Sequence, residues 1–132
     1  MTDSPQDAPR DASELKGKTG LTRLRNAALY SLSGLRTAYQ SEAAFRQETW
    51  GAAVLIPLAF FMPASGMGRA LMIASVLLVL VVELLNSGIE ALADRVSQEN
   101  HILIKKAKDV GSAAVMLALI NVVVVWVSVL FG

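Results

Sequence analysis

The chain of 132 residues has no cysteine and one histidine, His101. Without cysteine there can be no disulfide bond, zinc–thiolate site, iron–sulfur cluster or cysteine nucleophile, and one histidine cannot build a multi-histidine metal cage within one chain. Charge is scarce too: 17% of the residues are charged, the formal net charge is +1, and no charged residue follows Asp109. This balance provides no bulk attraction to nucleic acid.

The common catalytic signatures are also missing. The sequence contains no Gly-x-x-x-x-Gly-Lys-Ser/Thr loop, no kinase glycine-rich loop with its catalytic-loop partner, no dinucleotide-binding fingerprint and no Ser/His/Asp set. Residues 1–18 are acidic, contain Pro5 and Pro9, and lack the basic start and apolar core of a secretory signal. We expect these residues to form a disordered tail without catalytic work.

Apolar residues are abundant: 54% of the chain is hydrophobic and its mean hydropathy is +0.50. Three uncharged stretches, 49–68, 70–82 and 110–132, approach or reach the roughly 20 residues that cross a bilayer. We therefore predict an all-α membrane domain over residues 19–132, with three transmembrane helices at about 49–66, 68–96 and 109–131. The second helix is expected to continue beyond the membrane as one long helix.

The distribution of cations predicts the orientation. Basic residues concentrate before residue 47 and between residues 95 and 108, whereas Arg69 stands alone between the first two spans. The positive-inside rule then places the N-terminus in the cytoplasm and the C-terminus outside.

Residues 19–40 have the pattern of an amphipathic helix. Apolar residues recur at three- and four-residue spacing on one stripe: Leu21, Leu24, Ala28, Leu32, Leu35 and Tyr39. We interpret this segment as a basic helix on an anionic membrane surface. A soluble helix packed on a protein core has the same pattern and remains the alternative.

The second predicted span carries polar residues on one narrow stripe, at spacings of three, four and four: Glu83, Asn86, Glu90 and Asp94. Glu83 lies about one turn inside the apolar boundary, where an ionisable group is costly and therefore indicates a functional site. The stripe could instead only mark the end of the span, and for Asp94 both interpretations stay open.

Two further clusters fall at the same cytoplasmic boundary. The segment 42–48 precedes the first span, and Lys108 and Asp109 open the third. Carboxylates from separate segments at one height can hold Mg²⁺ together with phosphate and water, and Lys108 offers a compact positive charge for phosphoryl transfer. As an alternative, Lys108 and Asp109 could form only a solvated helix cap.

Three segments carry a family resemblance: EAAFRQE (42–48), VELLNSGIEALADR (82–95) and AKDVGSAAV (107–115). They resemble the small prokaryotic integral-membrane diacylglycerol kinases, and the similarity extends from about Thr19 to the C-terminus. The resemblance implies a homotrimer in the bacterial inner membrane with sites shared between subunits. It also implies that MgATP phosphorylates the hydroxyl of diacylglycerol to give phosphatidic acid.

Carried over by position, the resemblance implies that Glu83 is the general base and that Glu42 and Glu90 are metal ligands. The positions that it implies for ATP binding are Arg23, Tyr30, Glu42, Glu90, Glu99, His101, Lys108 and Asp109. Those that it implies for shaping the site and the lipid groove are Asn86, Asp94 and Ser112.

Two other functions stay open. An undecaprenol kinase of the same architecture would share the acidic stripe and differ mainly in its lipid groove. A non-catalytic three-span scaffold would need neither three carboxyls at one boundary nor a Lys-Asp pair facing them.

Overall fold

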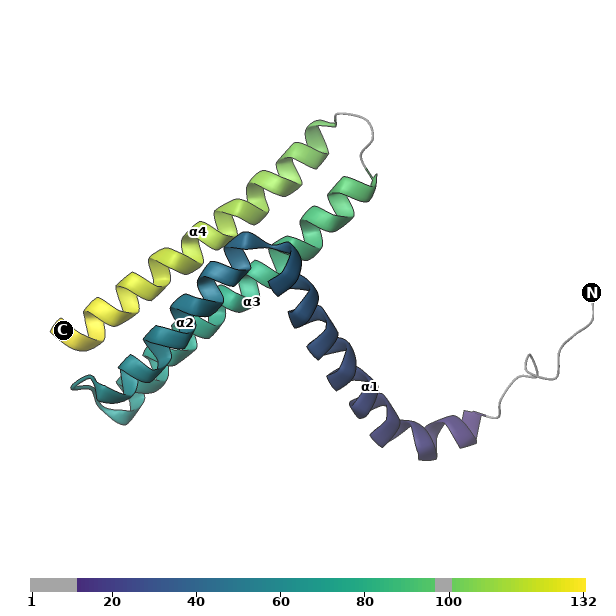
Figure 1. Cartoon of the computed structure of the whole chain (residues 1–132), viewed down its shortest axis with the longest axis horizontal. Helices are drawn as coiled ribbons and strands as arrows, with labels where there is room; N and C mark the ends of the chain where they lie inside the picture. The colour runs from purple at the N-terminus through teal and green to yellow at the C-terminus, as the bar shows by residue number, and fades with distance from the viewer. Residues whose placement is uncertain (1–11, 97–100) are drawn as a thin grey trace, which may run out of the picture. The chain divides into compact units, whose positions relative to one another are not determined.

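The computed structural model describes residues 12–96 and 101–132, which form four α-helices and, within these ranges, no β-strand. The helices are α1 (Ala12–Ser41), α2 (Ala43–Phe61), α3 (Gly66–Val96) and α4 (Ile102–Phe131) (Figure 1). The all-α prediction is confirmed. Residues 1–11 of the expected tail lie outside the described residues, and α1 begins at Ala12, so the tail stays a prediction.

The larger part of α1 belongs to a compact unit that ends at Arg36, and the rest of the chain forms a second unit from Thr37 onward. In the first unit, every side chain from Gly20 to Arg36 is exposed, including the large apolar residues of the predicted stripe. The helix itself agrees with the predicted surface helix of residues 19–40.

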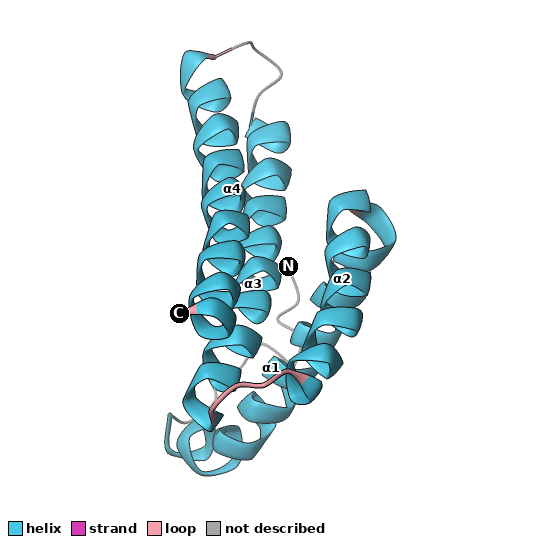
Figure 2. Ribbon diagram, turned by 90° about the vertical axis from the view of Figure 1, so that its left-hand side faces the viewer, coloured by secondary structure: helices cyan, strands magenta, loops and turns pink. Residues whose placement is uncertain are grey.

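In the second unit, α3 contacts both α2 and α4, and α4 runs antiparallel alongside it (Figures 1 and 2). The buried residues at these contacts are mostly small or β-branched, which lets the helix backbones approach closely: Ala52, Ala59, Val76, Val79 and Ala118. A Cβ atom at Gly68 would lie 2.8 Å from Val129, so α3 and α4 are especially close at this end. The indole N–H of Trp126 on α4 also donates a hydrogen bond to the Met72 carbonyl of α3 (3.2 Å).

Two helices among the described residues are long and apolar enough to cross a membrane, namely α3 with 31 residues and α4 with 30. At a rise of about 1.5 Å per residue each is about 45 Å long, more than the roughly 30 Å of a hydrocarbon core. Only 28% of the most apolar stretch of α3 and 6% of that of α4 are buried, unlike the core helices of a soluble protein. The chain is therefore a membrane protein.

Helix α2 ends earlier than the first predicted span of 49–66. Its uncharged part, Thr49–Phe61, is about 20 Å long. The helix continues through Pro57 but stops before Pro63, because a residue that precedes proline disfavours helical dihedrals, and Met62 is extended at φ −81° and ψ 148°. A third transmembrane helix therefore stays a prediction.

Polar contacts close the turn between α2 and α3. The Ser65 hydroxyl accepts a hydrogen bond from the Gly68 N–H (3.0 Å) and so caps the start of α3. The Arg69 guanidinium donates through Nε to the carbonyl of Ala59 (3.0 Å) and through Nη2 to those of Met62 and Ala64 (3.2 Å each). Arg69 thus satisfies the Ala59 carbonyl, which the end of α2 leaves without a helical partner, and binds two carbonyls of the turn.

We expect Arg69→Met, which keeps the apolar stem but removes every donor, to lower the free energy of unfolding by about 2 kcal/mol or more, because three carbonyls lose a charged donor. Thermal unfolding in detergent measures this change. Lys106→Met, which removes an exposed cation from α4, is the matched control and should shift the melting temperature little. Equal melting temperatures for the two variants would contradict the role given to Arg69.

Candidate active site

The side chains of the polar stripe become more exposed toward the C-terminal end of α3. Glu83 is only 6% exposed, Asn86 and Glu90 are half-buried, and Asp94 is exposed. One helix therefore carries a carboxyl shielded from water and, about three turns further on, a carboxyl open to it.

The partner of Glu83 is a second carboxyl group, that of Glu48 on α2. The two side chains are joined by a hydrogen bond. Two carboxyl groups can form such a bond only when one of them is protonated, since two carboxylates offer no donor. The bond between α2 and α3 therefore forms only while one carboxyl of the pair is protonated.

Glu48 is the carboxyl of this pair whose pKa is raised by burial. It lies one residue before the uncharged stretch of α2. Desolvation, followed by the hydrogen bond and the charge repulsion from Glu83, raises the pKa of Glu48 from 4.5 to about 7. Below about pH 7 the Glu48 carboxyl can thus donate a hydrogen bond to the Glu83 side chain.

Asn86 packs against the α4 backbone beside this pair. Its Oδ1 atom is so close to the Cα of Gly111 that a Cβ atom there would overlap it, so the approach requires glycine. Both Asn86 Oδ1 and Glu48 Oε2 are buried without a hydrogen-bond partner. Buried acceptors of this kind are costly, and they mark a place where a donor from a ligand or water would be stabilised.

At the cytoplasmic end an ion pair joins α3 to α4. Lys108 Nζ donates to Asp94 Oδ1 at 2.5 Å. This contact is consistent with the prediction that both residues lie at the cytoplasmic boundary of their helices. This hydrogen bond, with a smaller contribution from the charge of Glu90, raises the pKa of Lys108 above its ordinary value. Lys108 is thus a cation held beside the acidic stripe.

Asp109 has a different partner from its neighbour Lys108. Its carboxylate pairs with Lys105 one turn earlier on α4 (2.5 Å), and both side chains are exposed. An exposed pair at i,i+4 contributes at most about 0.5 kcal/mol, so a ligand could readily displace it.

Glu42 is the single residue between α1 and α2, where it takes the N-cap position of α2 with an extended backbone and makes no side-chain capping bond. Its half-buried carboxylate is therefore not used by the helix. No group of three or more acidic or histidine side chains that could hold a metal occurs among the described residues. Mg²⁺ commonly takes only one or two protein carboxylates and completes its shell with phosphate and water, so the assignment of Glu42 and Glu90 as its ligands stays a prediction.

The remaining predicted site residues are not brought together with this cluster by any contact between described side chains. Arg23 and Tyr30 are exposed on the part of α1 that forms a unit of its own. His101 is the N-cap of α4 and Ser112 lies about three turns into that helix, and both are exposed. Glu99 lies outside the described residues.

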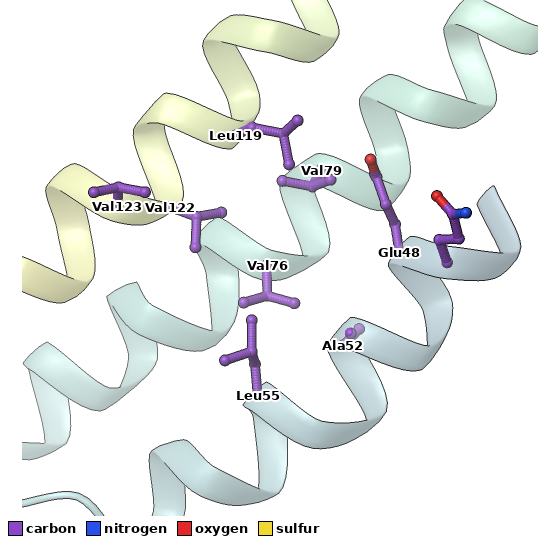
Figure 3. A pocket seen from close by; sticks show the side chains of 10 residues that line it. Glu48, Ala52, Leu55, Val76, Val79, Leu119, Val122 and Val123 are labelled. Atoms are coloured by element: carbon purple, nitrogen blue, oxygen red, sulfur yellow. The ribbon is translucent and has the colours of Figure 1, made fainter. Parts of the chain in front are cut away.

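A groove of about 360 Å³ extends from Glu48 along α3, between α2 and α4. Figure 3 shows the aliphatic side chains of all three helices facing this space, with Glu48 at one end. The residues that line it are Gln47, Glu48, Gly51, Ala52, Leu55, Val76, Val79, Leu119, Val122 and Val123.

Sequence reasoning missed Glu48, although the signal was present. Glu48 is the last charged residue before the uncharged stretch that opens at Thr49, so it must lie near the depth at which Glu83 interrupts its own apolar run. Two carboxyls at one depth on neighbouring spans predict a pair, which is the arrangement of Glu48 and Glu83.

Comparisons with known proteins identify the family of the chain. The model of the family described as prokaryotic diacylglycerol kinase matches residues 29–130. A diacylglycerol kinase of Pseudomonas aeruginosa is 55% identical over 120 residues, which are 91% of this chain and 98% of the relative. Those of Haemophilus influenzae and Escherichia coli K12 are 50% and 47% identical over 86% of this chain, and over 96% and 93% of their own length.

The matched region contains the acidic stripe of α3, its partner Glu48 and the ion pair of Asp94 with Lys108. With both the family model and close relatives covering most of its length, the chain belongs to the prokaryotic diacylglycerol kinase family.

Proposed function

We propose that this protein transfers the γ-phosphoryl group of MgATP to the hydroxyl of diacylglycerol and forms phosphatidic acid at the cytoplasmic face of the inner membrane. One observation carries the proposal: Glu48, the partner of the buried Glu83, lies at one end of an apolar groove, and the polar stripe that starts at Glu83 becomes exposed toward the C-terminal end of α3. Such a site is open to a lipid from the membrane and to a nucleotide from water.

Glu83 is the general base in this proposal. It takes the proton of the lipid hydroxyl while the hydroxyl oxygen bonds to the γ-phosphorus, and the bond from that phosphorus to the bridging oxygen of ADP breaks. Glu48 donates a hydrogen bond to Glu83 and so orients the base.

The polar end of the site binds the nucleotide. Glu42 and Glu90 hold Mg²⁺, which supplies charge neutralisation on the phosphates when bound. Lys108 exchanges Asp94 for a phosphate oxygen, a step made easy by the partial exposure of this ion pair. The further ATP contacts are Arg23, Tyr30, Glu99, His101 and Asp109, and Asn86, Asp94 and Ser112 shape the site.

The groove between α2 and α4 accommodates an acyl chain of the lipid. Its lining is almost entirely aliphatic, and its volume of about 360 Å³ falls within the range of small-ligand pockets. An acyl chain lying there would bring the glycerol hydroxyl to the carboxyl pair at the end of the groove.

The membrane arrangement that we propose has α2 as a third span, α1 on the cytoplasmic surface and the C-terminus outside. The concentration of cations before residue 47 and near residues 95–108 supports this orientation. The apolar surface of α4, 6% buried in its most apolar stretch, leaves room for contacts with lipid and with two further copies in a homotrimer that shares its sites.

Phosphate transfer to defined lipids in proteoliposomes tests the function. Radiolabel from the γ-phosphate of ATP should appear in phosphatidic acid when diacylglycerol is supplied, and in undecaprenyl phosphate at a rate at least tenfold lower. Faster labelling of undecaprenol would favour the alternative lipid substrate, and labelling of neither lipid would contradict the kinase assignment.

We expect Glu83→Gln, which keeps the size of the side chain and removes its basicity, to lower kcat for lipid phosphorylation about 10²- to 10⁴-fold with little change in the KM for MgATP. Steady-state kinetics in mixed micelles give both constants. The matched control is Ser87→Ala, one turn along the same helix, which should retain parental kcat. More than about a tenth of parental kcat in Glu83→Gln would place the base elsewhere.

We expect the parent protein to lose stability as the pH rises from about 5 to about 8. Because the folded-state pKa of Glu48 is raised from 4.5 to about 7, its protonated form stabilises the fold, and this contribution disappears as the pH rises through about 7. Melting temperatures of Glu48→Gln, which cannot ionise, should depend less on pH, whereas Ser87→Ala should follow the parent. Parallel curves for parent and Glu48→Gln would contradict the shared proton.

A further inference from the structure

The junction of α1 and α2 is fixed by side chains that the catalytic proposal does not use. The second unit of the chain begins with the last turn of α1, and one non-helical residue, Glu42, separates it from α2. We refer to residues 37–50 as the elbow. Ala38 and Phe45 are buried within it.

Arg46 holds the two helix ends of the elbow together. Its Nη1 donates hydrogen bonds to the carbonyls of Tyr39 (2.8 Å) and Gln40 (3.0 Å), which belong to the last turn of α1. The last turn of α1 contains no basic residue of its own, so the cation that complements this helix end comes from α2.

A second bond crosses the elbow between two aromatic residues. The indole N–H of Trp50 on α2 donates to the phenolic oxygen of Tyr39 on α1 at 3.1 Å. The polar atoms of the two rings thus satisfy each other, yet Trp50 is 65% exposed and Tyr39 36% exposed. Rings that pair their polar edges and leave their faces open are typical of the membrane–water interface.

The position of the pair along the chain indicates the same environment. Arg46 and Glu48 are the last charges before the uncharged stretch that begins at Thr49, and Trp50 is the second residue of that stretch. The Tyr39–Trp50 pair therefore lies where the charged part of the chain ends and the apolar part of α2 begins.

We propose that Tyr39 and Trp50 form an interfacial lock: their ring faces lie in the lipid headgroup layer, and their hydrogen bond fixes the elbow so that the Glu42 carboxylate is held at that depth. Both are positioning residues, because they act through Glu42. The proposal rests on the proposed function in one respect, the assignment of Glu42 to the nucleotide-bound metal. The Glu42 side chain itself makes no capping bond to the helix.

The chain offers a matched control for the hydrogen bond. It has only two tryptophans, and Trp126 makes an equivalent indole bond of 3.2 Å to the Met72 carbonyl, on the helix pair α3 and α4 and far along the chain from the elbow. Tyr39→Phe and Trp50→Phe each remove the elbow bond and keep a ring, whereas Trp126→Phe removes the other indole bond.

Steady-state kinetics of these variants test the positioning role. Tyr39→Phe and Trp50→Phe should each raise the KM for MgATP about three- to fivefold and leave the KM for diacylglycerol unchanged, in keeping with the loss of one hydrogen bond. The double variant should be no worse than either single one, because both remove the same bond. Trp126→Phe should keep the parental KM for MgATP. Unchanged KM values in the two elbow variants, or additive effects in the double variant, would overturn the lock.

Fluorescence quenching tests the depth without any catalytic readout. In the Trp126→Phe protein Trp50 is the only tryptophan, and in proteoliposomes its emission should be quenched more by lipids brominated near the headgroup than by lipids brominated near the chain ends. Stronger quenching from the chain ends, or quenching by aqueous acrylamide alone, would overturn the interfacial placement. Because this result does not depend on kinase activity, failure of the lock and failure of the proposed function can be told apart.

Discussion

A carboxyl group buried among apolar helices must find a hydrogen-bonding partner, and this constraint organises the site. Removing a lone carboxylate from water is too costly, so Glu83, 6% exposed, is paired with Glu48 from the neighbouring helix. The pair joins α2 to α3 at the depth where the polar stripe begins. It also leaves one proton, held by Glu48, at the point where a base is needed.

The rest of the fold holds the helices that carry this pair in register. Small residues let α3 contact both of its neighbours, Gly111 gives Asn86 its place beside α4, and Arg69 closes the opposite end of α2 and α3. Because α2 and α4 flank α3 without filling the space between them, an aliphatic groove remains and ends at Glu48. The same packing that buries Glu83 therefore gives a lipid access to it.

Periodicity and hydropathy predicted the features that are set within a single helix, such as its length and which residues share a face. The stripe from Glu83 to Asp94 follows from the 3.6-residue repeat, and the long α3 follows from a pattern that continues beyond the apolar run. Hydropathy did not predict where α2 ends. Pro63 disfavours helical dihedrals at Met62, so the helix stops at Phe61 although apolar residues continue. Ion pairs between helices were only partly predictable. Lys108 pairs with Asp94 of α3, which lies at the same depth, but Asp109 pairs with Lys105 of its own helix. The Glu48 contact depends on the rotation of α2 about its axis, which local sequence does not fix.

The central claim is that Glu48, beside Glu83, keeps its proton up to about pH 7, and infrared difference spectroscopy of the protein in lipid tests it most directly. The account predicts a protonated-carboxyl absorption in the parent that disappears as the pH is raised through about 7 and is absent at neutral pH from Glu48→Gln. A parent protein without that absorption near neutral pH, or a Glu48→Gln variant that retains it in full, would contradict the account.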